Sequence, residues 1–147
     1  MRDIDICVWK LRMVKEAEIP YRAISNPDDI FEFLTDSLKL NTATEEYMYM
    51  LTTDNHGNVT SVSQVSHGDL GSSVASAQSI FKRALISNAA TIILCHNHPS
   101  GHTEPSEDDI RTTRRLADAG DLLGVRVLDH IIVGHGEYFS FKKEGLL

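Results

Sequence analysis

The segment that most constrains this chain is an apolar run that leads directly into a cluster of polar side chains. Thr91–Cys95 (TIILC) is unbroken in its hydrophobicity, which is typical of a β-strand covered on both faces. His96-Asn97-His98-Pro99-Ser100-Gly101 follows at once, and Pro105-Ser106-Glu107-Asp108-Asp109 comes after a short loop. A strand covered on both faces needs structure on both sides of its sheet. The sequence therefore predicts a sheet flanked by helices, with polar chemistry where this strand ends.

The remaining sequence supplies the elements for such a domain. Asn26 is a good helix cap and Pro27 suits the first helical position, which predicts a helix that runs to about residue 40. Helices are also predicted over 75–87 and 106–119, the second stopped by Gly120. Strands are predicted over 4–14 (at a sheet edge), 46–53, 59–65, 91–95, 125–133 and 138–141, with a turn at 55–58 and a loop at 67–71. The pattern predicts one α/β domain with a mainly antiparallel or mixed sheet.

Composition limits the classes of partner and location. In 147 residues no stretch approaches the roughly 18 apolar residues that span a bilayer, and the charged start is unlike a signal peptide. A cytoplasmic protein without a membrane partner is therefore expected. The formal net charge of −7 counts against DNA as a partner, although a local basic patch would be compatible with it. Cys7 and Cys95 form no C-x-x-C pair, and both are expected to be reduced and buried.

The two histidines at the end of the predicted strand are candidate metal ligands. On an extended backbone, residues two apart point to the same side, so the rings of His96 and His98 can reach one ion. The alternative is a pair of ordinary surface histidines beside a turn, and an H-x-H pattern by itself is a weak signal.

Asp109 is the third candidate ligand, but Ser106-x-x-Asp109 is also a helix capping box. The two functions are compatible, because a capping Ser106 oxygen accepts the Asp109 N–H and keeps its own proton free for an oxyanion. The helix dipole would also keep Asp109 ionised. Two imidazoles and a carboxylate, with one position left for water, are the ligands of a hydrolytic zinc site. The nearby acids Glu104, Glu107 and Asp108 are candidate bases by position alone, and each is better explained as a solvated charge of the loop or of the first helical turn.

The spacing of these residues resembles a known motif. His96-x-His98-Pro99, six residues, Ser106, two residues and Asp109 is similar to the full JAMM (MPN⁺) metalloprotease motif. The stretches ALISNAATIILCHNHPSG, PSEDDI, LLGVRVLDHIIVG and YFSFKKEGLL resemble its RadC-like branch. The resemblance implies a RadC-like JAB domain over 26–147, after an N-terminal strand or extension over 1–25. It also implies a single-domain three-layer α/β/α sandwich with a mixed sheet, the JAMM/MPN fold, similar to that of cytidine deaminases.

The resemblance also implies a function. It suggests a zinc-dependent hydrolase that cleaves a peptide or isopeptide bond in a peptide or protein conjugate, with Zn²⁺ on His96, His98 and Asp109. Members of this family carry an upstream glutamate that activates water, and EYMYMLTTD places this role on Glu46, with Glu45 as the neighbouring alternative.

The RadC name leads to an alternative, an accessory protein of DNA repair whose metal site serves DNA processing or structure. Longer RadC-like proteins carry an N-terminal region of helix-hairpin-helix character, which we expect to be missing here. That absence and the acidic charge would weaken DNA binding. An inactive scaffold is disfavoured because all the metal positions are filled, and a zinc deaminase is rejected because H-x-E and P-C-x-x-C are absent.

Two further positions carry polar groups that need an explanation. Asp129-His130 interrupts the apolar run VRVLDHIIV, and a satisfied core pair is favoured over a role in supporting the metal ligands. His102 stands in the loop after the histidine motif, where RadC-like proteins usually have aspartate. We expect it to be exposed, because a fourth protein ligand would occupy the position needed for water.

Overall fold

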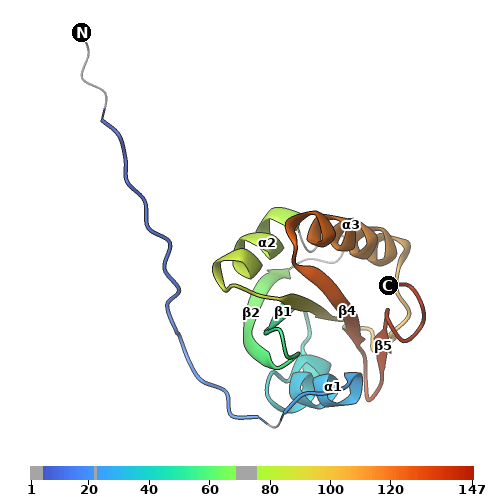
Figure 1. Cartoon of the computed structure of the whole chain (residues 1–147). Helices are drawn as coiled ribbons and strands as arrows, with labels where there is room; N and C mark the ends of the chain where they lie inside the picture. Colours follow the sequence, from blue (N-terminus) through green and yellow to red (C-terminus); the bar gives the residue numbers. More distant parts are fainter. Residues whose placement is uncertain (1–4, 22, 69–75) are drawn as a thin grey trace.

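The computed structural model describes residues 5–21, 23–68 and 76–147. Its elements, in chain order, are α1 (Pro27–Asp36), the 3₁₀ turn η1 (Leu40–Thr42), β1 (Glu46–Thr53), β2 (Val59–Gly68), α2 (Ala77–Ile86), β3 (Thr91–Asn97), α3 (Glu107–Leu123), β4 (Arg126–Val133) and β5 (Tyr138–Ser140). The strands form one sheet in the order β2-β1-β3-β4-β5, in which only β3 and β4 run parallel. Helix α1 covers one face, and α2 and α3 cover the other (Figure 1). The predicted three-layer sandwich with a mixed sheet is confirmed.

Strand β3 lies at the centre of the sheet and contributes to both cores. Ile92 and Leu94 pack in the core under α2 and α3, whereas Ile93 and Cys95 pack in the core under α1. Successive side chains of a strand point to opposite faces, so a strand buried between two layers must be apolar at every position. This explains the unbroken apolar run and confirms that both of its faces are covered.

The helices differ from their predicted bounds for identifiable reasons. Asn26 caps α1 as predicted and accepts from the N–H of Asp29 at 2.9 Å, but the helix ends at Asp36. Lys39 takes a left-handed conformation (φ 54°) and starts the separate 3₁₀ turn η1, so the chain from 37 to 40 does not continue α1. Gly120 does not end α3, since the helix continues to Leu123 and Gly124 (φ 75°) caps it. Gly120 is instead a point of close approach: a Cβ there would lie 2.4 Å from the carbonyl oxygen of Val125.

Strands β1 and β2 form the predicted hairpin. Asp54 holds the turn, because its Oδ1 accepts from the backbone N–H groups of His56 (2.8 Å) and Asn58 (2.9 Å). β2 is longer than predicted, so His67 and Gly68 belong to a strand rather than to a loop. The rest of the predicted loop, residues 69–71, lies outside the described residues.

The predicted edge strand over 4–14 is wrong for residues 5–14, which extend away from the domain without regular secondary structure (Figure 1). Alternation of side chains gives a strand only where another strand offers hydrogen bonds, and no strand of the described residues pairs with this segment. Cys7 is consequently exposed, contrary to expectation, whereas Cys95 is buried as expected. Within the described part of the chain, no helix has the length and apolar character needed to cross a membrane.

Candidate metal centre

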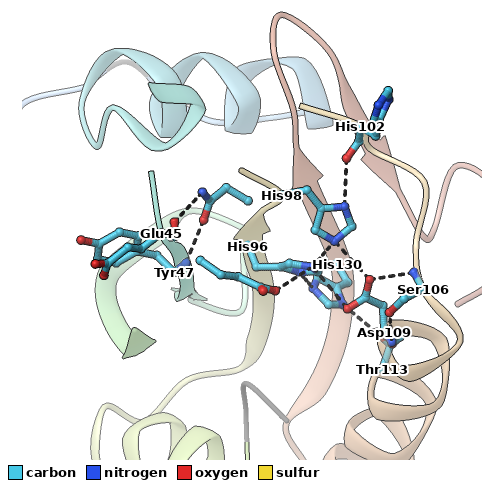
Figure 2. A network of polar contacts seen from close by, with 11 residues as sticks. Glu45, Tyr47, His96, His98, His102, Ser106, Asp109, Thr113 and His130 are labelled. Atoms are coloured by element: carbon cyan, nitrogen blue, oxygen red, sulfur yellow. Dashed lines mark hydrogen bonds and ion pairs between the residues drawn. The ribbon is translucent and has the colours of Figure 1, made fainter. Parts of the chain in front are cut away.

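The two motif histidines meet at the end of the central strand. His96 is the next-to-last residue of β3. Just beyond the strand, the N–H of His98 donates to the carbonyl of Val133 at 3.0 Å, which holds His98 against the end of β4. The Nε2 atoms of His96 and His98 lie 3.0 Å apart (Figure 2). The predicted convergence of two imidazoles two residues apart is therefore present in the fold.

Asp109 reaches the same point from the start of α3. Its Oδ1 lies 3.4 Å from Nε2 of His96, and its Oδ2 lies 3.2 Å from Nε2 of His98. The capping box is also formed, because the N–H of Ser106 donates to Asp109 Oδ2 (2.8 Å) and the N–H of Asp109 donates to Ser106 Oγ (3.0 Å). The cap thus fixes the carboxylate beside the two rings, and the two functions considered for this segment are compatible in space.

The hydrogen bonds of His98 determine which of its nitrogens faces the cluster. Its Nδ1 lies 2.9 Å from the backbone carbonyl oxygen of His102, which can only accept, so Nδ1 carries a proton. In the neutral ring, Nε2 therefore presents a lone pair to Asp109 and His96. His102 thus contributes its backbone carbonyl, which orients His98. Its ring is exposed and points away from the cluster (Figure 2).

The charges of the cluster favour a cation between its members. The Asp109 carboxylate raises the pKa of His98. Burial acts to raise the pKa of Asp109, but the neighbouring imidazoles of His96 and His98 and the N–H of Ser106 outweigh it and hold that pKa well below its usual range. A proton or a metal ion can supply the positive charge that this geometry stabilises.

The cluster fits zinc in both donor chemistry and spacing. A tetrahedral zinc with bonds of about 2.0–2.2 Å separates its ligand atoms by about 3.3–3.5 Å. The Nε2 atoms of His96 and His98 lie 3.0 Å apart, and they lie 3.4 Å and 3.2 Å from Oδ1 and Oδ2 of the Asp109 carboxylate, respectively. Imidazole nitrogen and carboxylate oxygen are zinc ligands, and three of them leave a position for water.

Glu46 borders this cluster, and Glu45 does not. Glu46 is 8% exposed, and its Oε1 lies 3.9 Å from Nε2 of His96. One possible ligand atom each from Glu46, His96 and His98 fall within 4.8 Å of one another. The neighbouring Glu45 instead contacts the ring of His67 on the outer part of the hairpin. The alternation of β1 explains this, because adjacent residues face opposite sides of the sheet.

Asn97, which lies between the motif histidines, holds the backbone on both sides of Glu46. Its Oδ1 accepts from the N–H of Tyr47 at 2.8 Å, and its Nδ2 donates to the carbonyl of Glu45 at 2.9 Å. The side chain is 1% exposed. Sequence reasoning assigned it no function, although its position inside the H-x-H motif was a possible signal.

The three acids near the motif do not enter the cluster. Glu104, Glu107 and Asp108 are all exposed, and Asp108 forms an ion pair with Arg111. They are therefore solvated charges, which is the explanation that the sequence favours.

Asp129 and His130 face different neighbours. Asp129 accepts from the backbone N–H groups of His130 (2.7 Å) and Lys142 (3.0 Å) and from the hydroxyl of Ser140 (2.6 Å), which makes it a structural anchor for the C-terminal turn. His130 lies beside His96, with its Nε2 2.7 Å from Nδ1 of that ring. Burial lowers the pKa of His130 well below its usual value.

Comparisons with known proteins agree with this description. The model of the RadC-like JAB domain matches residues 24–146. UPF0758 proteins are similar to this chain: that of Pelobacter propionicus is 41% identical over 84% of the chain, that of Trichlorobacter lovleyi 42% over 84%, and that of Methanosarcina mazei 38% over 92%. The matched regions make up 53%, 53% and 58% of those proteins, so the chain spans little more than half the length of these relatives.

Proposed function

The chain belongs to the RadC-like JAB domain family, and on that premise we propose that it is a zinc-dependent hydrolase that cleaves a peptide or isopeptide bond. The observation that carries the proposal is the convergence of Nε2 of His96, Nε2 of His98 and the Asp109 carboxylate within 3.0–3.4 Å, beside the buried Glu46. His96, His98 and Asp109 would hold the metal. Zinc bound there would lower the pKa of a coordinated water to about 7 and polarise the substrate carbonyl.

The protein's own residues would move the protons and stabilise the charge. Glu46 is near enough to take the proton of the attacking water and to return it to the leaving amine. Ser106 accepts the N–H of Asp109 through Oγ, so its O–H proton is free to donate to the oxyanion of the tetrahedral intermediate. His98 is kept in orientation by the carbonyl of His102.

Metal content is the first test of this proposal. Purified full chain should contain about one zinc, and His98→Ala should lose it because a three-ligand site then keeps only two ligands. His56→Ala is the matched control, since His56 is exposed in the hairpin turn far from the cluster. Zinc retained by His98→Ala, or no zinc in the unmodified chain, would reject the site.

Hydrolysis is the second test. Peptides and isopeptide-linked conjugates should be cleaved by the zinc-loaded chain, with single- and double-stranded DNA in the same panel. Glu46→Gln should lower the rate by about 10²- to 10⁴-fold, as expected for loss of a general base. Glu45→Gln should leave the rate unchanged, because Glu45 contacts His67 instead. Cleavage of DNA alone would replace the proposal with the DNA-processing alternative.

A further inference from the structure

A buried chain of hydrogen bonds leads from the candidate ligand His96 to helix α3. His96 Nδ1 lies 2.7 Å from His130 Nε2, and His130 Nδ1 lies 2.6 Å from the hydroxyl oxygen of Thr113. Thr113 Oγ1 in turn lies 2.6 Å from the backbone carbonyl oxygen of Asp109, to which it donates. The chain therefore begins at one candidate ligand and ends at the backbone of another (Figure 2).

Every side chain of this path is inaccessible to solvent. His96 and His130 are each 1% exposed, and Thr113 is fully buried. The ring of Phe141 stacks on His130, with centroids 4.8 Å apart and 13° between the planes. Buried polar atoms need partners within the protein, so the positions of the protons along this path follow from the donors and acceptors themselves.

The hydroxyl of Thr113 sets the direction of the chain because it has a single proton. A carbonyl oxygen can only accept, so Thr113 gives its proton to the carbonyl of Asp109 and must accept from Nδ1–H of His130. Nε2 of His130 is then an acceptor, and it takes the proton on Nδ1 of His96. Nε2 of His96 is left with a lone pair that points into the cluster.

The opposite direction would disable the site. If Thr113 donated to His130, then Nε2–H of His130 would donate to Nδ1 of His96. His96 would carry its proton on Nε2, where it would occupy the position of a metal. Only the first direction uses the bond from Thr113 to the carbonyl of Asp109.

We infer that His130 and Thr113 are positioning residues that hold His96 in the tautomer protonated on Nδ1, with Nε2 free for a metal ion. The ligand role of His96 rests on the proposed function, whereas the tautomer itself exists without metal. The path also links the orientation of the His96 ring to the backbone of Asp109, so the two elements that supply these ligands, β3 and α3, are held together beneath the site.

The ring nitrogens of the ¹⁵N-labelled full chain provide the direct test. Long-range ¹H–¹⁵N spectra of the metal-free protein should show His96 protonated on Nδ1. In Thr113→Val, which keeps the shape of the side chain but cannot accept from His130, the proton of His96 should shift to Nε2. Thr113→Ser keeps the hydroxyl and should restore the original tautomer. Thr53→Val is the matched control, because Thr53 is also buried but lies at the end of β1 that is farthest from Glu46 and the cluster.

Zinc affinity, measured by competition with a chromogenic chelator, is the second readout. Thr113→Val should bind zinc about 10- to 100-fold more weakly, the usual cost of losing a partner behind a metal ligand. Thr113→Ser and Thr53→Val should bind as the unmodified chain does. The inference is overturned if metal-free His96 carries its proton on Nε2, or if Thr113→Val changes neither the tautomer nor the affinity. Absence of zinc binding by the unmodified chain would reject the proposed function alone, because the tautomer is read without metal.

Discussion

Replacement of Asn97 by alanine should release the segment that carries Glu46 while leaving the three candidate ligands in place. The backbone pairing of β1 with β3 starts at Met48 opposite His96. Beyond that pair, the side chain of Asn97 takes the place of a strand and bonds the N–H of Tyr47 and the carbonyl of Glu45. Loss of this side chain therefore frees the backbone on both sides of Glu46.

The size of the effect follows from which of the two backbone groups water can reach. Leaving a buried polar group without a partner costs about 1–3 kcal/mol. Tyr47 is half-buried, and its N–H is bonded to Asn97, which is only 1% exposed. Water therefore reaches this N–H poorly, and the N–H should bear most of the cost. Glu45 is exposed, so its carbonyl can bond to water instead. A total of about 2 kcal/mol is expected, which corresponds to about a 30-fold change in a local opening equilibrium.

Amide hydrogen exchange measured by NMR can localise this change. In Asn97→Ala the amide of Tyr47 should exchange about 30-fold faster, whereas that of Leu51, central in β1, should change only as much as global stability does. Asn41→Ala is the matched control, because the buried Oδ1 of Asn41 accepts no hydrogen bond from the described residues. If the amide of Tyr47 keeps its protection in Asn97→Ala, the argument that Asn97 positions Glu46 is refuted.

Three further predictions concern stability. Gly120→Ala, normally a gain of about 1 kcal/mol in a helix, should lower the free energy of unfolding in urea by about 1–3 kcal/mol, because the new Cβ would lie 2.4 Å from the carbonyl oxygen of Val125; a gain would contradict this. Burial and the hydrogen bond to Asp28 raise the pKa of Tyr138 to about 12, so the stability that this phenol contributes should be complete below pH 10 and lost as the pH rises to 12. Phenolate absorbance should show Asp28→Asn lowering that pKa, with Tyr138→Phe as the reference. Ser106→Ala should lower unfolding free energy by about 1 kcal/mol through loss of the cap, and Ser106→Thr should retain most of it.

Local signals in the sequence predict those parts of the fold whose cause is local. The cap at Asn26 places the start of α1, the turn held by Asp54 makes the hairpin, and the apolar run Thr91–Cys95 identifies the central strand. The same reasoning is wrong for residues 5–14, because no strand in the described part of the chain pairs with their alternating side chains. Gly120 does not end α3 as its residue type predicts, because its lack of a side chain makes room for the carbonyl of Val125 beyond the helix, a contact that spacing along the helix does not reveal.

The same distinction between local and distant causes applies to the candidate site. The motif identifies His96, His98 and Asp109, because they lie close together in sequence and their residue types are those of a zinc site. The contacts of Asn97 and Thr113 could not be predicted in this way. One crosses to a strand about 50 residues away in sequence, and the other depends on which face of α3 meets β4.

The position of His130 depends on an irregularity in β4 that alternation does not predict. β4 pairs with β3 through Ile92 opposite Val127 and Ile93 opposite Asp129, so Leu128 is an extra residue. A single inserted residue in a strand is a β-bulge, and it exchanges the faces of all the residues that follow.

The packing on the two sides of the bulge shows this exchange. Val127 belongs to the core under α2 and α3, whereas Ile131, an even number of residues later, belongs to the core under α1. Without the bulge, Asp129 would share the face of the metal centre and His130 would point toward α1. With it, the carboxylate anchors the C-terminal turn and the imidazole meets Nδ1 of His96. The support of the candidate ligand therefore depends on one inserted residue, which makes the face on which a polar residue lies a property of strand pairing rather than of local sequence.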